Sequence, residues 1–329
     1  MNQTSEYQRR VLACFKALAS GDAIGKQTEM LSNGEVQHWY PEGISEFQGQ
    51  PGTIIPRYKG NRKHEWRIGE TTDDTEQTLA VARVLLSTRE PSHTDFGRQL
   101  LKCRKSLHPG VKSLWSLHQS DDPSRVALDG DGCGAAMRVA PVGVLYSPNR
   151  IEELIGVAHQ SSIPTHGGQL AICAAAAVAG AVSAAIEGWD PKDVMEFAIQ
   201  IAKRAEAFAP PLNDKATLSM ADAISRMYND LSTYKTLLAR ELADRYFPDR
   251  PETKVPLAIN LALLTESSER TILLAANIGG DSDSVASIGG AIAGALHPDE
   301  VNNDWFDIVH SVNQDDLLGI AEALVKLRH

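Results

Sequence analysis

The chain has 329 residues, of which 43% are hydrophobic and 22% are charged, so it is long enough and apolar enough to bury a sizeable core. Its formal net charge of -10 excludes a protein that wraps nucleic acid with a basic face, and predicts no nucleic-acid groove. The four cysteines are widely separated and form no C-x-x-C pair, so we expect neither a disulfide framework nor a thiolate zinc site, and the cytoplasm is the simplest location.

The first predicted element is a helix over residues 7–20, where apolar side chains recur at helical spacing. We expect Gly21 to end it. The polar stretch 30–70 shows little periodicity, which predicts a long loop insertion, and loops of that length usually serve as lids or binding loops. Glu29, just before this loop, is an acid of the kind that most often lies on a solvated surface.

Helices are predicted for most of the rest of the chain, and period-2 alternation is almost absent. The further predicted helices are residues 95–107, 111–118, 150–159, 193–208, 214–229, 232–243, 257–265, 306–312 and 315–327. The most apolar run, 170–186, is rich in alanine and just short of a membrane span, so we expect an internal helix and no membrane partner. These features predict an all-α protein with one compact domain over residues 5–329.

Two short segments each place two carboxylates and a hydroxyl within one turn at a predicted helix start. They are Thr72-Asp73-Asp74 and Asp281-Ser282-Asp283-Ser284, the second of which follows a glycine pair. A helix start needs only one oxygen acceptor, and either cluster alone would most often be a cap. Four carboxylates brought together would repel unless they were protonated or neutralised, and oxygen ligands suit Mg²⁺ or Mn²⁺. Together the clusters therefore predict a site for one or two divalent cations.

Two glycine-containing segments are candidates for ligand binding. The segment Gly130-Asp131-Gly132-Cys133-Gly134 resembles a dinucleotide fingerprint only superficially, because no strand precedes it; a tight turn or a backbone that approaches a ligand fits better. The segment Thr165-His166-Gly167-Gly168 precedes the alanine-rich helix. Its N–H groups could hold a phosphate or diphosphate, and the alternative is a plain helix start with an interhelical histidine.

Taken together, these segments resemble the ADP-ribosylglycohydrolase family. The matching motifs are Gly21-Asp22-Ala23-Ile24-Gly25 with Glu29, Thr72-Asp73-Asp74-Thr75, Gly132-Cys133-Gly134-Ala135-Ala136-Met137-Arg138, Thr165-His166 and Gly279-Gly280-Asp281-Ser282-Asp283-Ser284. They occur in the family's order from residue 7 to about residue 297. The resemblance implies a single orthogonal helical domain with a binuclear Mg²⁺ or Mn²⁺ centre at the floor of a cleft, and a substrate-side role for the loop 30–70.

The resemblance also implies roles for individual residues. The ligands of the two cations would be Thr72, Asp73, Asp74, Asp281, Asp283 and Ser284. The loops that bind ADP-ribose would contribute Gly132, Cys133, Gly134, His166, Gly167 and Gly168. Glu29 and Asp283 are the candidates for positioning a water or transferring protons. Some family members carry an acid in the region that corresponds to residues 107–111, where this chain has none, so the general acid or base is left open.

We therefore expect hydrolysis of the N- or O-glycosidic bond at the anomeric carbon of ADP-ribose. The substrate would be an ADP-ribosylated protein or small molecule, and ADP-ribose the product. Two alternatives stand beside this expectation: a non-catalytic ADP-ribose-binding module, and a two-metal phosphodiesterase. The sequence alone does not choose between arginine, serine, a nucleobase and a metabolite as the acceptor, between Mg²⁺ and Mn²⁺, or between oligomeric states.

Overall fold

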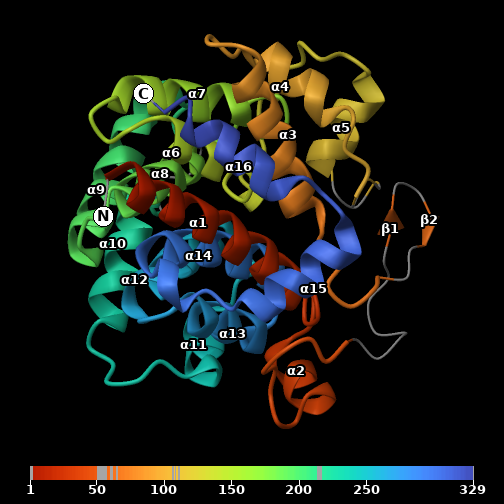
Figure 1. Ribbon diagram of the computed structural model, residues 1–329, viewed down its shortest axis with the longest axis vertical. Coiled ribbons are helices and arrows are strands. Elements are labelled where there is room, and N and C mark those ends of the chain that lie inside the picture. The colour runs from red at the N-terminus through yellow and green to blue at the C-terminus, as the bar shows by residue number, and fades with distance from the viewer. Residues whose placement is uncertain are drawn as a thin grey trace.

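The computed structural model describes residues 3–49, 58–59, 62–63, 66–105, 107, 109, 112–212 and 217–328. These residues form helices and one short strand pair (Figure 1), which confirms the predicted all-α fold. The α-helices are α1 (Gln3–Gly25), α2 (Asn33–Trp39), α3 (Asp73–Ser87), α4 (His93–Leu100), α5 (Lys112–Ser120), α6 (Ala140–Leu145), α7 (Ile151–Ser162), α8 (Gln169–Ile186), α9 (Pro191–Ala205), α10 (Met220–Leu231), α11 (Ala239–Tyr246), α12 (Pro251–Leu264), α13 (Ser268–Ile278), α14 (Ser282–Leu296), α15 (Asn303–Asn313) and α16 (Leu317–Val325). The 3₁₀ turns are η1 (Cys133–Ala135), η2 (Glu206–Phe208) and η3 (Pro298–Glu300), and the antiparallel strands are β1 (Tyr58–Lys59) and β2 (Arg62–Lys63).

The helices α1 and α14 form the centre of the fold, with α14 directly behind α1 in Figure 1. They pack antiparallel, backbone against backbone, through glycines spaced four apart. A Cβ atom at Gly21 would lie 2.2 Å from the carbonyl oxygen of Ala286, and one at Gly290 would lie 2.5 Å from that of Ala17. The prediction that Gly21 ends the first helix is therefore wrong: this glycine lies inside α1, where the close approach of α14 leaves no room for a side chain.

The alanine-rich helix α8 is the second buried element. It is long and apolar enough to cross a membrane by length and composition alone, but 94% of that stretch is buried inside the protein. Its small side chains allow close packing: a Cβ at Gly143 of α6 would lie 2.4 Å from the carbonyl oxygen of Ala179. The packing is that expected of an internal helix.

Two predicted features of the chain differ in the structure. The predicted loop 30–70 contains the helix α2, which is stabilised by a capping box in which Ser32 and Glu35 each accept from the other's backbone N–H. Residues 50–57, 60–61 and 64–65 of that loop lie outside the described residues. The predicted helix 232–243 instead starts at Ala239, because residues 232–234 form turns closed by hydrogen bonds to the end of α10.

Candidate active site

The two acid clusters lie at the N-termini of α3 and α14, which the fold brings together although they are about two hundred residues apart in sequence. Thr72 is the N-cap of α3, and its hydroxyl accepts from the backbone N–H of Asp74. The hydroxyl of Ser284, in the first turn of α14, donates to Asp74 Oδ2 over 3.4 Å. The sequence-based expectation that the clusters share one site therefore matches the geometry of these side chains.

Asp22, in the last turns of α1, holds the start of α3 and was not singled out as a site residue from the sequence. It is completely buried, and its carboxylate accepts from the backbone N–H groups of Thr72 and Thr75 and from the Thr75 hydroxyl, which lies 2.5 Å away. On the other side, the Ser282 hydroxyl donates to the carbonyl oxygen of Gly25 at the end of α1. The end of α1 thus holds both helix starts in place.

Two carboxylates of the site are buried with an oxygen that has no partner. Asp74 and Asp283 are 2% and 3% exposed, and Oδ1 of each has no hydrogen-bond partner among the residues that the structure describes. Burial and the nearby Asp283 carboxylate raise the pKa of Asp74 well above its ordinary value. Burial and the neighbouring carboxylates of Asp281, Asp22 and Asp73 likewise raise the pKa of Asp283 to about 8, against the opposing charge of a nearby lysine. The surroundings of these two carboxyl groups therefore favour their protonated form in the free protein.

The third carboxylate, Asp281, has a cation beside it. Lys254 Nζ, from the first turn of α12, lies 2.6 Å from Asp281 Oδ2, and the Cys133 thiol donates to the same oxygen over 3.0 Å. Burial opposes ionisation of Asp281, but Lys254, Cys133 and Ser284 together hold its pKa below the ordinary value. Lys254 was not predicted as a site residue, because nothing in the sequence around it distinguishes it from a surface lysine.

The donor set of this site suits a hard divalent cation. It offers carboxylate and hydroxyl oxygens from the starts of α3 and α14, and two of the buried carboxylate oxygens have no other partner. Among the described residues, no three His, Cys, Asp or Glu side chains converge on one point. One of the carboxylates, Asp281, is paired with the ammonium group of Lys254. The residues present therefore fit the predicted cation ligands chemically.

Glu29 follows α1 between two residues that contact the segment at the start of α14: the Thr28 hydroxyl donates to Ser282 Oγ over 3.0 Å, and the Met30 N–H donates to the carbonyl oxygen of Gly280. Its side chain is 21% exposed and forms an ion pair with Lys26, whose ammonium group also lies 4.8 Å from the centre of the Trp66 ring. Lys26 is one of the charges that act on Asp283. Glu29 therefore belongs to the chain segment that contacts the start of α14, and its side chain is partly exposed.

The predicted ligand-binding turn packs against the predicted histidine. A Cβ atom at Gly134 would lie 2.6 Å from His166 Cε1, and one at Gly132 would lie 3.4 Å from His166 Nε2. Cys133, between these glycines, reaches Asp281 with its thiol. Burial and the charge of Arg138 lower the pKa of His166 to about 3, so its ring is neutral at physiological pH. The turn, the histidine and the acid clusters form one continuous site.

The amides of Gly167 and Gly168 do not have the role predicted from the sequence. The N–H of Gly167 donates to the carbonyl oxygen of Asp129, and that of Gly168 donates to the carbonyl oxygen of Gly130. In the first turn of α8, the N–H groups of Leu170 and Ala171 both donate to the Asp131 carboxylate, over 2.9 and 3.3 Å. The expectation that these two amides hold a diphosphate is therefore wrong, because the chain itself already satisfies them.

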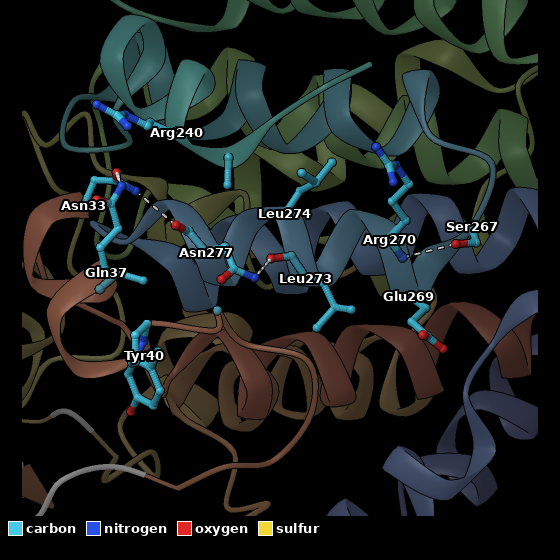
Figure 2. A pocket seen from close by; sticks show the side chains of 14 residues that line it. Asn33, Gln37, Tyr40, Arg240, Ser267, Glu269, Arg270, Leu273, Leu274 and Asn277 are labelled. Atoms are coloured by element: carbon cyan, nitrogen blue, oxygen red, sulfur yellow. Dashed lines mark hydrogen bonds between the residues drawn. The ribbon is translucent and has the colours of Figure 1, made fainter. Parts of the chain in front are cut away.

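A separate groove of about 500 Å³ lies between α2, α11 and α13. In Figure 2, Gln37 and Tyr40 face it from the α2 side, Arg240 lies above it, and Leu273 and Asn277 line it from α13. It contains none of the predicted site residues. It does use part of the segment 30–70, so the described part of that segment forms surface structure beside the helix that leads to Asp281.

The comparisons with known proteins concern the chain as a whole. The family model for ADP-ribosylglycohydrolase matches residues 3–329. The chain is 22% identical to the ADP-ribosylhydrolase ARH3 of Homo sapiens, over 94% of this chain and 91% of that protein. It is 25% identical to the ADP-ribosylarginine hydrolase Tri1 of Serratia proteamaculans, over 97% of this chain and 80% of that protein. A solved structure, an ADP-ribosylglycohydrolase-related protein complex, matches with a TM-score of 0.71 and 25% identity over 99% of this chain and 100% of the other. The chain belongs to the ADP-ribosylglycohydrolase family.

Proposed function

We propose that this protein is a divalent-cation-dependent hydrolase that cleaves the glycosidic bond at the anomeric carbon of ADP-ribose. The observation that carries the proposal is the meeting of the two acid clusters, in which Asp74 and Asp283 each keep a buried oxygen without a partner. Such oxygens are costly to bury unless a cation or a ligand neutralises them. The family membership of the chain supports ADP-ribose as the substrate moiety.

The cations, when bound, would supply positive charge to orient the ribose hydroxyls and a water molecule. The residues that would hold them are Thr72, Asp73, Asp74, Asp281, Asp283 and Ser284. Glu29 is our candidate for moving protons at the scissile bond, since its side chain is partly exposed and its segment contacts the start of α14. Nearby carboxylates also stabilise the positive charge that develops on the sugar as the bond breaks.

We propose ADP-ribosylated arginine as the first acceptor to test. A guanidinium leaving group is cationic, and the acidic surroundings of the site favour a cation. The relative Tri1 is named for its action on ADP-ribosylarginine, which supports the same choice.

One observation favours a second candidate function, a module that binds ADP-ribose without cleaving it. Lys254 already neutralises Asp281, and an ammonium group in that place can replace a cation as the counter-charge. In such a module, ADP-ribose would bind in the presence of a chelator, and no linkage would be cut.

The test incubates the protein with ADP-ribosylated arginine and serine peptides, with Mg²⁺, with Mn²⁺ or with a chelator, and identifies the products by mass spectrometry. We expect intact ADP-ribose, dependent on the cation. Asp73→Asn and Asp283→Asn should abolish its release, whereas Asp307→Asn, which removes an exposed carboxylate on α15, should not. Production of AMP would indicate a phosphodiesterase, and binding without any product would indicate the non-catalytic module.

A further inference from the structure

Arg138 is a buried cation without a carboxylate partner. It is completely buried, and its hydrogen-bond partners among the described residues are all neutral groups. Its guanidinium donates to Gln77 Oε1 over 2.7 Å, to the carbonyl oxygen of Ser161 over 2.7 Å and to Thr165 Oγ1 over 2.8 Å. A buried charge that is held only by neutral acceptors destabilises a fold, so a different role is needed to explain it.

The contacts of Arg138 determine the direction of a chain of hydrogen bonds. A guanidinium can only donate, so Thr165 Oγ1 accepts from it and keeps its own proton for another partner. The nearest such partner is His166 Nδ1, at 2.8 Å, whereas the carbonyl oxygen of Ser162 is 3.5 Å away. The short distance to Nδ1 favours this nitrogen as the acceptor of the Thr165 proton, and a neutral ring that accepts at Nδ1 carries its own proton on Nε2.

The same reasoning orients Gln77. Because Arg138 has no acceptor, the Gln77 oxygen faces it, and the Gln77 amide nitrogen then donates to Asp73 Oδ2 over 2.9 Å. Arg138 thus starts two hydrogen-bond paths. One runs through Gln77 to Asp73, a proposed cation ligand, and the other runs through Thr165 to His166, a proposed ADP-ribose contact. The sequence did not predict either hydrogen-bond path, because Gln77 lies in an ordinary helical segment and Arg138 at the end of a glycine-rich motif.

The proton on His166 Nε2 faces the glycine-rich turn. Cε1 and Nε2 of the ring are the atoms that a side chain at Gly134 would strike, at 2.6 and 2.9 Å. Because neither Gly132 nor Gly134 carries a side chain, the backbone of the turn can approach this edge of the ring closely. A donor in that position suits a hydroxyl or phosphate oxygen.

We propose that Arg138, through Gln77 and Thr165, is a positioning residue that fixes His166 as an Nε2–H donor toward ADP-ribose and at the same time orients Asp73. The part that concerns ADP-ribose rests on the proposed function. The hydrogen-bond chain itself does not, because it is a property of the free protein.

The direct test is the tautomer of His166 in the free protein, read from the nitrogen chemical shifts of ¹⁵N-histidine-labelled protein and assigned with His166→Gln. We expect the Nε2–H tautomer in the wild type and in Thr165→Ser, which keeps the hydroxyl. Thr165→Val should give a mixture of tautomers, whereas Thr271→Val, which removes a buried hydroxyl on α13, should leave the His166 signals unchanged. An Nδ1–H tautomer in the wild type, or an unchanged tautomer in Thr165→Val, would overturn the proposal.

Calorimetry with ADP-ribose then tests the link to function. Thr165→Val should bind about tenfold more weakly than Thr165→Ser, as expected for one lost hydrogen bond. Gln77→Met should weaken the binding of Mn²⁺, measured by electron paramagnetic resonance of the free ion, and leave the tautomer in place. Equal ADP-ribose affinity for the two Thr165 variants would overturn the role in binding. A wild type that shows the expected tautomer but binds no ADP-ribose would contradict the proposed function and still support the hydrogen-bond chain.

Discussion

Asp283→Asn should change how the stability of the metal-free protein depends on pH. The pKa of Asp283 is about 8 in the folded protein, because of burial and the neighbouring carboxylates. In the unfolded chain an aspartate has a pKa of about 3.9. The folded state therefore keeps a proton that the unfolded state releases, and the free energy of unfolding falls as pH rises from the unfolded value to the folded value.

The size of this effect follows from the shift. Each pH unit inside the window changes the free energy of unfolding by about 1.4 kcal/mol for one proton. Between pH 5 and pH 7 the wild type should therefore lose about 3 kcal/mol relative to Asp283→Asn. Urea unfolding in the presence of a chelator, at several pH values, measures the difference. Asp307→Asn is the control for the loss of one carboxylate, because its side chain is exposed on α15.

Mg²⁺ extends the same experiment. A cation that binds the ionised Asp283 takes the place of the proton that the folded state otherwise keeps. Saturating Mg²⁺ should therefore flatten the pH dependence of the free energy of unfolding of the wild type and stabilise the protein at neutral pH. If the free energy of unfolding depends on pH in the same way for wild type and Asp283→Asn in the chelator, Asp283 is not a buried carboxyl group with a raised pKa. No stabilisation by either Mg²⁺ or Mn²⁺ would refute the cation site.

Three further substitutions test the surroundings of the site. Asp22→Ala leaves three donors at the start of α3 without an acceptor and should lower the free energy of unfolding by about 3 kcal/mol, measured by urea titration. Lys254→Met frees Asp281 and should tighten Mn²⁺ binding about tenfold, read by electron paramagnetic resonance; unchanged affinity would show that the ammonium group does not compete. Gly134→Ala pushes a methyl group into the His166 ring and should weaken ADP-ribose binding by about tenfold or more in calorimetry, with little change in Mn²⁺ binding.

The sequence predicts the all-α fold well because its strongest signals are local. Helical periodicity, and the surplus of acids at two helix starts, can be read within a single turn. The backbone contact between α1 and α14 could not be predicted in the same way. Gly21 reads as a helix end by local rules, and only the partner helix, 2.2 Å from where its Cβ would be, shows why a glycine is needed inside α1.

In the site, too, residues with a local sequence signal could be predicted, and residues whose role depends on distant parts of the chain could not. Thr72, Asp73 and Asp283 could be proposed from their spacing and family motif. Asp22 lies within a family motif but its role depends on partners at the start of α3, and Lys254 lies outside every motif and pairs with Asp281 far along the chain. The amides before α8 illustrate the opposite error. A free helix N-terminus is a sound general expectation for an anion site, but Asp131, from a distant turn, already occupies this one.

We propose that the two acid clusters together bind divalent cations, and that the protein uses these cations to hydrolyse the glycosidic bond of ADP-ribose. The most direct measurement is product release from an ADP-ribosylated arginine peptide by wild type and Asp73→Asn, with Mg²⁺ and with a chelator. We predict that only the wild type with Mg²⁺ releases intact ADP-ribose together with unmodified arginine. Equal release by Asp73→Asn, or by the wild type in the chelator, would contradict the account.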